Sequence, residues 1–318
     1  MWRTLRRARH RLRHPTRYRL LNALRKVESW PIERLQVCQQ QAFDDIVRHA
    51  ITHTAFYRHR YASRVPPGGS IDPATLPILT KADIRAAAGQ MLNEQADRAA
   101  VGQGFTGGST GEPLMFYYDA LKHERMLAGM MRGFMMSGWR PGQRVLYLWG
   151  AGRDTRAGGV FGNTENGRLS VERAVAADRY TTENLEAWSQ LIRSWRPALI
   201  YGYASALDEL ARHRLACEYP PPSGLLGVYS TAEPLAASQR ERVQAAFGCH
   251  VFNQYGCREV PNIAWECRHG SLHVFSDLVK LETLDGMRDP RLLVTSLTDR
   301  LMPFIRYEIG DTGELMPA

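Results

Sequence analysis

The stretch from residue 144 to residue 255 alternates between short apolar runs and longer amphipathic segments, and this pattern constrains the fold most. Strands that alternate with helices form a mainly parallel sheet with helices packed on it. After Gly270 the apolar period changes to two, which predicts an antiparallel segment. The expected strands are 144–149, 197–203, 225–229, 250–255, 272–275, 278–281 and 292–297, and the expected helices are 182–195, 204–217 and 234–247. The fold class is therefore α/β.

The pattern of apolar and capping residues in the first 140 residues predicts further helices. Apolar positions recur at helical spacing over 30–50. Thr80 is a suitable N-cap for a helix that starts at Lys81, with Asp83 in its first turn. A long helix is expected over about 120–137, and we interpret its many methionines as core filler.

Composition places the chain among ordinary globular proteins. At 318 residues, with 44% hydrophobic and 23% charged residues, it could form two domains or one large α/β unit. No run of 18 apolar residues is present to span a membrane, and no apolar run follows the basic start as in a secretory signal. The five cysteines are odd in number, which indicates a reducing compartment. We therefore expect a cytoplasmic protein.

The positive charge is concentrated at the N-terminus. The formal net charge is +9, whereas residues 1–26 hold nine Arg, one Lys and no acid, so the rest sums to −1. We predict a basic arm over residues 1–28 and a core domain over 29–318. The arm is interpreted as a solvated or locally packed leader. The alternative is a basic amphipathic helix that rests on anionic lipid or nucleic acid, either as a membrane tether or as the main activity of a non-catalytic protein.

Residues 105–113 (Phe-Thr-Gly-Gly-Ser-Thr-Gly-Glu-Pro) crowd three glycines and three hydroxyl residues into nine positions. Glycine lets a ligand approach the main chain, and hydroxyls add hydrogen-bond donors without bulk. This combination suits phosphate oxygens, although an ordinary surface loop has a similar composition.

Two known motifs match this loop by letter. Gly102-x-Gly104-x-x-Gly107 matches the dinucleotide fingerprint, but a polar segment stands where that motif needs a strand. Gly107-x-Ser109-x-Gly111 matches the nucleophile elbow, but the strand-like residues 114–118 replace its helix. A serine hydrolase that uses Ser109 with His250 or His273 remains an alternative. Otherwise the loop is a hydroxyl-rich phosphate loop between two strands.

Three later stretches lie at or near the ends of predicted strands, where open α/β sheets bind ligands. They are residues 230–234, 254–259 and 302–311. Tyr255 could lie flat on a purine, Gly256 permits close approach, and Glu259 could hold Mg²⁺ beside phosphates. Asp311, after a glycine turn, could accept hydrogen bonds from ribose hydroxyls. Each stretch alone could also be a helix cap, a turn or a surface acid.

Taken in order, these motifs resemble the adenylate-forming superfamily, most closely the phenylacetate–CoA ligase branch with its capsular-biosynthesis proteins. Thr106–Pro113 aligns with a phosphate loop of the form Ser-Ser-Gly-Thr-Thr-Gly-Lys-Pro. Tyr255, Gly256 and Glu259 match a Tyr-Gly-x-x-Glu element, and Pro303–Asp311 matches Pro-x-Ile-Arg-Tyr-x-x-Gly-Asp. The segments 76–83 and 265–273 also resemble that branch. The resemblance covers about residues 30–318.

The resemblance implies the large N-terminal core of these enzymes and a reaction of ATP with a carboxylic acid, expected to be aromatic. The product is an acyl-adenylate, which then passes to coenzyme A or to the phosphopantetheine thiol of an acyl carrier protein. The expected partners are thus a small-molecule acid and CoA or a carrier protein, with peripheral membrane contact through the arm as a further alternative. No nucleic acid is expected.

The same resemblance implies roles for individual residues. Thr106, Thr110 and Glu259 would be catalytic, with Glu259 positioning Mg²⁺. The nucleotide would contact Thr106, Gly107, Gly108, Ser109, Thr110, Gly111, Ala232, Glu233, Gln254, Tyr255, Gly256 and Asp311. From strand order, the acid would lie against Trp149, Gly150, Tyr201, Tyr203 and Ala204.

Two departures from the family pattern stand out. Glu112 replaces the usual lysine of the phosphate loop, which could weaken ATP binding by around 1 kcal/mol or more. The chain ends at Ala318, where the family continues into a C-terminal lid domain that supplies a catalytic lysine. The chain therefore resembles a truncated enzyme, and we expect nucleotide binding with weak or no turnover.

Cys249, Cys257, Cys267, His269 and His273 lie close together in sequence. Their spacing matches no known zinc pattern, so scattered structural cysteines are the favoured interpretation. Zinc bound by Cys249, Cys257, Cys267 and His273 is the alternative.

Overall fold

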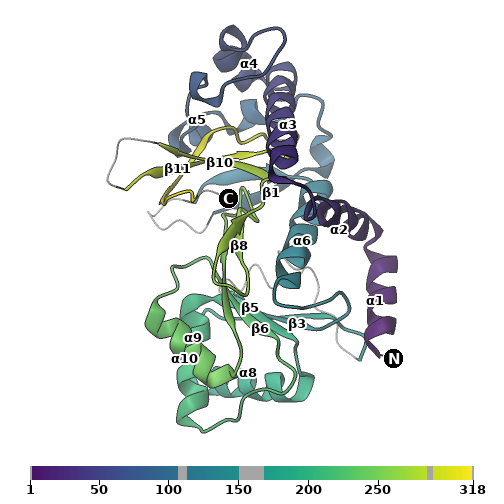
Figure 1. Cartoon of the computed structure of the whole chain (residues 1–318), viewed down its shortest axis with the longest axis vertical. Coiled ribbons are helices and arrows are strands. Elements are labelled where there is room, and N and C mark those ends of the chain that lie inside the picture. Colours follow the sequence, from purple (N-terminus) through teal and green to yellow (C-terminus); the bar gives the residue numbers. More distant parts are fainter. Residues whose placement is uncertain (1, 107–112, 150–167, 285–288, 317–318) are drawn as a thin grey trace. The chain divides into compact units, whose positions relative to one another are not determined.

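The computed structural model describes residues 2–106, 113–149, 168–284 and 289–316, and the chain divides into two compact units (Figure 1). The parallel-sheet unit comprises Met1–Arg19, Gly129–Tyr255 and Ala264–His273. The antiparallel unit comprises Leu20–Ala128, Gly256–Ile263 and Val274–Ala318. Each unit is described by itself.

The parallel-sheet unit is built on a seven-stranded sheet of order β4-β3-β5-β6-β7-β8-β9. Neighbours among β4, β3, β5, β6 and β7 pair in parallel, and β8 returns antiparallel to β7. The mainly parallel sheet predicted from the alternating pattern is thus confirmed. The strands are β3 Val145–Trp149, β4 Glu172–Ala176, β5 Leu199–Tyr203, β6 Gly227–Thr231, β7 Val251–Tyr255, β8 Ala264–Glu266 and β9 Leu272–Val274.

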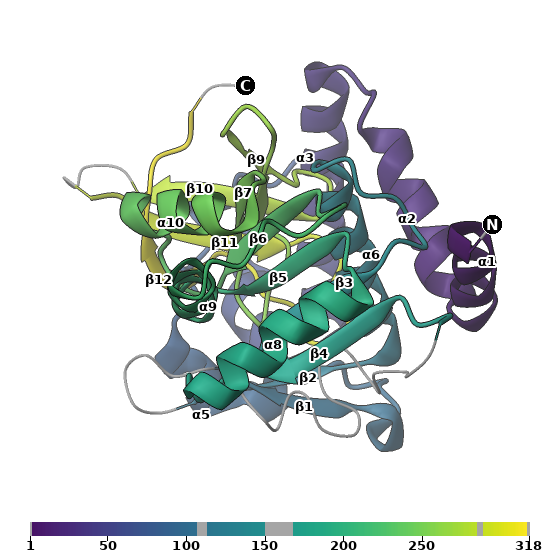
Figure 2. The same cartoon turned by 90° about the horizontal axis from the view of Figure 1, so that it is seen from below.

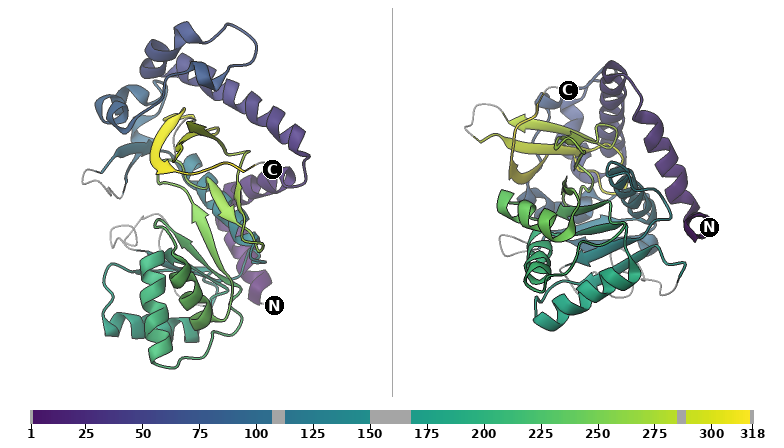
Figure 3. Two further views of the ribbon diagram at one scale, coloured as in Figure 1. Left: turned by 60° about the vertical axis from the view of Figure 1, so that its left-hand side comes forward. Right: turned by 60° about the horizontal axis from the view of Figure 1, so that its bottom comes forward.

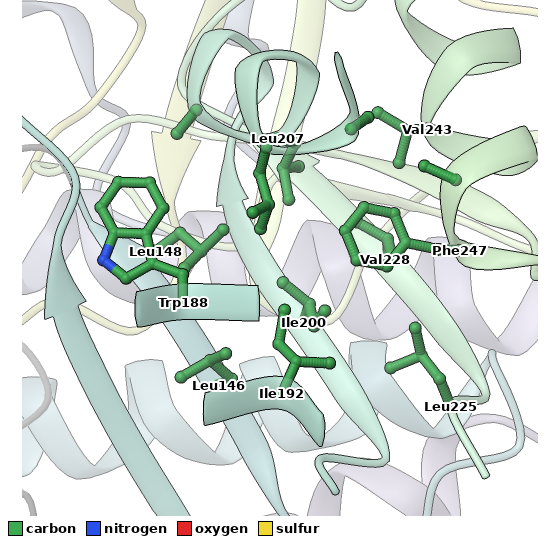
Figure 4. Packing of buried hydrophobic residues seen from close by; sticks show 14 of the residues in the cluster. Leu146, Leu148, Trp188, Ile192, Ile200, Leu207, Leu225, Val228, Val243 and Phe247 are labelled. Atoms are coloured by element: carbon green, nitrogen blue, oxygen red, sulfur yellow. The ribbon is translucent and has the colours of Figure 1, made fainter. Parts of the chain in front are cut away.

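Three helices cover one face of this sheet: α8 Thr182–Trp195, α9 Ala204–Ala216 and α10 Ala237–Phe247 (Figure 2). They bury a largely aliphatic cluster against the strands, to which α8 contributes Ile192, α9 contributes Leu207 and α10 contributes Val243 (Figure 4). Such burial stabilises by about 1.5–3 kcal/mol for each fully buried aliphatic side chain. The apolar positions that recur every 3.6 residues in these helices therefore face the sheet and pack into this core.

The opposite face of the sheet is aromatic. Tyr147, Tyr201 and Tyr229 stand in one register row across β3, β5 and β6. Phe134 packs edge-on against Tyr201 and Trp265, with ring centroids 5.7 and 5.4 Å apart. Because side chains alternate across a strand, the same strands that supply the aliphatic cluster also supply this layer.

The antiparallel unit holds two small sheets, β1-β2 and β10-β11-β12, and several helices (Figure 3). Thr80 and Asp83 form the expected capping box at the start of α5. The strands are β1 Gly102–Phe105, β2 Met115–Tyr118, β10 Val279–Leu284, β11 Arg291–Ser296 and β12 Tyr307–Thr312. The helices are α3 Ile32–His53, α4 Ala55–Tyr61, α5 Lys81–Met91 and most of α6 Ala120–Met135, with short 3-10 turns at Ala62–Arg64, Pro73–Thr75 and Arg98–Ala100.

The predicted helices and the predicted strands both lie within about three residues of the observed bounds. The predicted bounds of α8 are reproduced, and those of α3, α6 and α9 shift by only a few residues. Strand β6 spans Gly227–Thr231 and begins two residues later than predicted. Strand β4 was not predicted, since its half-exposed sequence Glu-Arg-Ala-Val-Ala lacks an apolar run.

The basic arm folds into α1 Trp2–Arg13 and α2 Pro15–Val27. Tyr18 and Leu21 of α2 are buried, whereas α1 contains no buried residue. Helix α1 is attached by contacts such as the bond from Arg6 Nε to Arg168 O, 3.0 Å. Within the described part of the chain, no helix combines the length and apolar character needed to cross a membrane.

Candidate functional site

Four parallel strands end at the same edge of the large sheet. Strands β3, β5, β6 and β7 end at Trp149, Tyr203, Thr231 and Tyr255. Parallel pairing aligns their carboxyl ends, which is where α/β sheets place their ligands. The pairing brings eight sequence-predicted residues to this edge: Trp149, Tyr201, Tyr203, Ala204, Ala232, Glu233, Gln254 and Tyr255.

An aromatic group lies at the end of β3 and β5. The ring of Tyr201 is nearly parallel to that of Trp149, with centroids 5.8 Å apart, and to that of Trp265, at 6.2 Å. Tyr203 meets Trp149 edge-on at 5.0 Å. Sequence reasoning missed the role of Trp265, because β8 reaches the sheet only through a return strand of three residues. Trp149, Tyr201 and Trp265 are buried against one another, whereas Tyr203 is half-buried at the strand end.

Gln254 ties three strand ends together. Its Oε1 accepts a hydrogen bond from the Tyr201 hydroxyl at 3.1 Å and another from the Thr231 hydroxyl, while its Nε2 donates to Tyr255 O at 2.8 Å. Burial raises the pKa of Tyr201, which therefore stays a neutral donor. The network fixes β5, β6 and β7 relative to one another at the edge.

The turn after β6 carries local strain and a helix cap. Ala232 has a φ of +64°, in the left-handed region that costs a non-glycine residue about 1–2 kcal/mol. The neighbouring Glu233 carboxylate accepts hydrogen bonds from the Ser205 N–H at 2.7 Å and the Ser205 hydroxyl at 3.0 Å. Glu233 thus anchors this turn to the first residues of α9. Strain of this kind gathers at functional sites, where the surroundings hold it in place.

A buried carboxylate marks the antiparallel unit. Glu259 is 3% exposed, and its Oε1 accepts a hydrogen bond of 2.8 Å from the Tyr307 hydroxyl. Burial, followed by the charge of Glu259, raises the pKa of Tyr307, so Tyr307 remains a donor. A carboxylate has about four acceptor positions, and this contact leaves capacity to bind a cation. The sequence flagged Tyr307 within a motif but not as the partner of Glu259.

The base of the glycine loop is closed by paired hydrogen bonds. The Thr106 N–H donates to Leu114 O at 2.9 Å, and the Leu114 N–H donates to Thr106 Oγ1 at 2.9 Å. Strands β1 and β2, which flank the loop, pair antiparallel. The predicted loop between two strands is therefore confirmed at its base. Gly107, Gly108, Ser109, Thr110, Gly111 and Glu112 lie outside the described residues, as does Gly150.

The glycines before the loop serve packing rather than a dinucleotide. A Cβ at Gly102 would come within 2.7 Å of the Tyr118 ring, and one at Gly104 within 2.4 Å of the Phe116 ring. Both glycines therefore make room for aromatic rings of β2, the strand with which β1 pairs. Arg258, between Gly256 and Glu259, donates from Nη1 to Phe105 O at 3.0 Å. This places a cation at the loop base, which the sequence motif did not indicate.

The glycine turn expected before Asp311 is instead a bulge within β12. Leu293 pairs with Glu308 and Arg291 pairs with Thr312, so one residue of β11 faces three of β12. Gly310, in the bulge, has a φ of +102°. A bulge redirects side chains at a sheet edge, and Asp311 is exposed there.

The zinc hypothesis finds no support. In the described ranges, no three His, Cys, Asp or Glu side chains gather in a way that could hold a metal ion. Burial raises the pKa of Cys249 to about 12, and burial followed by Glu259 raises the pKa of Cys257 well above its usual value. Zinc requires thiolates, which such surroundings disfavour.

Comparison with known proteins supplies further evidence. No protein-family model matches the chain. Protein CapK of Staphylococcus aureus is 26% identical over 89% of this chain and 65% of its own length. A phenylacetate-coenzyme A ligase of Thermus thermophilus is 28% identical over 90% of this chain and 67% of its own. The phenylacetate-coenzyme A ligase of Escherichia coli is 25% identical over 92% of this chain and 69% of its own length. The chain thus spans about two thirds of the length of these relatives.

Solved structures agree with this result. A 2-hydroxyisobutyryl-CoA ligase in complex with 2-HIB-AMP and CoA covers 88% of this chain and 63% of its own, with a TM-score of 0.71 and 18% identity. An open conformation of that ligase matches 84% of this chain and 67% of its own length, with a TM-score of 0.69 and 17% sequence identity. The chain has the fold of an adenylate-forming ligase. Its sequence resembles the phenylacetate–CoA ligase branch. These relatives give the serine-hydrolase alternative no support.

Proposed function

We propose that the chain is the nucleotide- and acid-binding core of an ATP-dependent acid–CoA ligase. The observation that carries the proposal is the edge of the large sheet, where Trp149, Tyr203, Thr231 and Tyr255 end four aligned parallel strands. The similarity to phenylacetate-coenzyme A ligases over about nine tenths of the chain supports it.

In the proposed reaction, a carboxylate oxygen of the acid attacks the α-phosphorus of ATP and pyrophosphate leaves. The thiol of CoA then attacks the acyl carbon and displaces AMP; a carrier-protein thiol is the alternative acceptor. Adenine would contact Ala232, Glu233, Gln254, Tyr255 and Gly256, and ribose would contact Asp311. Thr106 fits a phosphate contact, because its Oγ1 accepts from Leu114 and its O–H remains able to donate. Ser109, Thr110 and the loop glycines would complete that contact.

Glu259 would hold Mg²⁺. Its carboxylate oxygens suit the preference of that cation, and Tyr307 fixes the orientation of one of them. When bound, Mg²⁺ would offset charge that develops during phosphoryl substitution. The cation of Arg258 at the loop base would partly compensate for Glu112, which stands where the branch has lysine.

We further propose that the acid is aromatic. Tyr203 is half-buried at the end of β5 and lies edge-on to Trp149, so its ring would offer an aryl group an offset or edge contact. Trp149, Tyr201, Tyr203 and Ala204 come from the predicted acid site, and aromatic pairs add about 0.5–1.5 kcal/mol beyond area burial.

The test measures ATP binding by calorimetry, with and without Mg²⁺, and pyrophosphate release with aryl and alkyl acids. We expect Glu259→Gln to weaken ATP binding in Mg²⁺ by about tenfold or more, and the difference to vanish in EDTA. Glu94→Gln, an exposed acid of the same unit, is the control and should change neither value. A chain that binds no ATP, or a Glu259→Gln defect that persists in EDTA, would contradict these roles. Faster turnover of alkyl than aryl acids would contradict the aromatic substrate alone.

A further inference from the structure

Helix α1 carries an exposed apolar stripe that the proposed ligase reaction does not use. Trp2, Leu5 and Leu12 are 44%, 48% and 82% exposed. At 3.6 residues per turn, these three positions fall within about 80° of the helix circumference, an arc that also holds the half-buried Arg9. Scattered surface leucines are common, but three large exposed apolar side chains on one side of a twelve-residue helix indicate an interaction surface.

The stripe faces away from the rest of the parallel-sheet unit. A Cβ at Gly142 would come within 2.6 Å of Arg3 O and 2.9 Å of Arg7 Cβ, so the α1 backbone lies directly against the turn at Gly142. Arg7 stands about 180° around the helix from the middle of the stripe. His10, which bonds to the Tyr18 hydroxyl at 3.0 Å, holds the other end of the helix to buried Tyr18. The side of α1 that lies against the turn at Gly142 is thus roughly opposite the apolar stripe.

The basic charge around the stripe indicates which kind of partner would bind it. Residues 1–26 hold ten basic residues and no acid, whereas the other residues sum to −1. Arg3, Arg7, Arg11, Arg13 and Arg19 are all exposed. A helix with one apolar stripe and a basic remainder lies in the plane of a membrane surface, with its apolar side chains among the acyl chains and its cations at anionic headgroups.

We propose that α1 attaches this protein peripherally to anionic lipid bilayers, with Trp2, Leu5 and Leu12 as the inserted side chains. Arginines can extend their charged ends toward headgroups while their stems cover apolar surface. A nucleic acid would use the charge but not the stripe, and a second copy of this chain would use the stripe but meet ten like charges. Only an anionic bilayer satisfies both features. This inference is independent of the proposed ligase reaction.

The test is flotation of the whole chain with vesicles of phosphatidylcholine alone and of phosphatidylcholine mixed with phosphatidylglycerol. We expect binding to the mixed vesicles that weakens as salt rises. The variant Leu5→Ser/Leu12→Ser should lower the partition coefficient at least about tenfold. Its control, Leu121→Ser/Leu215→Ser, changes leucines that are 44% and 43% exposed on other helices and should leave binding unchanged.

The charge contribution has its own pair of variants. Arg11→Gln/Arg19→Gln should weaken binding to the mixed vesicles by about tenfold or more. Arg179→Gln/Arg193→Gln, at exposed positions outside the arm, should not. Circular dichroism and thermal melting should be unchanged in all four variants, since the substituted side chains are exposed.

Three results would overturn the proposal. The first is equal binding to neutral and anionic vesicles or to none. The second is affinity for single-stranded RNA or duplex DNA that exceeds vesicle binding and is insensitive to Leu5→Ser/Leu12→Ser. The third is a dimer in sedimentation velocity that the same leucine variant dissociates.

Discussion

The two faces of the seven-stranded sheet are built from alternate residues of the same strands, yet they differ in chemistry. The face under α8, α9 and α10 is aliphatic, with Leu146, Ile200 and Val228 as its strand residues. The other face presents Tyr147, Tyr201 and Tyr229. An aliphatic face can only pack, whereas tyrosine hydroxyls also fix polar partners such as Gln254 Oε1 and Gly133 O. Stability and site geometry are therefore largely divided between the two faces.

Truncation on the aliphatic face should have the largest effect on stability. Leu207 of α9 is fully buried, so Leu207→Ala should lower the free energy of unfolding by about 2–5 kcal/mol in urea denaturation. Leu215→Ala, on the exposed side of the same helix, should change it by less than about 0.5 kcal/mol. If the division of roles holds, ATP affinity of folded Leu207→Ala stays unchanged. A large loss of affinity would show that the two faces are coupled.

Adding one methyl group on the aromatic face should have the next largest effect. A Cβ at Gly133 of α6 would lie 2.1 Å from the fully buried Trp265 ring. Gly133→Ala should therefore destabilise by about 1–3 kcal/mol, since the ring and helix must separate. Gly89→Ala in α5, where no atom lies within 4 Å, should instead stabilise by roughly 0.5–1 kcal/mol. Equal effects at the two glycines would contradict the close packing inferred for Trp265.

Removing one hydroxyl from the aromatic face should have the smallest effect on stability. Tyr201→Phe keeps the ring contacts with Trp149 and Trp265 but deletes the bond to Gln254 Oε1. We expect a loss of about 0.5–1.5 kcal/mol in unfolding free energy. The KM for the acid should rise, because the end of β5 is no longer fixed to β7. Tyr180→Phe, which deletes an exposed hydroxyl contact with Ser205, is the control and should change neither quantity. A change in stability without any change in KM would confine Tyr201 to a structural role.

The helices and parallel strands were predictable because their signals are local. A capping box needs only Thr80 and Asp83, and a buried strand such as Val145–Trp149 needs only a short apolar run. Edge strand β4 and return strand β8 were missed, since their stability depends on neighbours supplied by distant residues. For the same reason Gly102 and Gly104 suggested a dinucleotide motif, whereas their partners are aromatic rings across a strand pair.

The sequence by itself determined the α/β class, the order of the elements and the motifs at residues 105–113, 254–259 and 302–311. Only the tertiary structure decided that Tyr307 holds Glu259, that Gln254 joins three strand ends, and that a bulge carries Asp311. Local order follows from backbone and side-chain preferences that act over a few residues. Hydrogen bonds between residues 48 or 53 positions apart exist only after the chain has closed around a core.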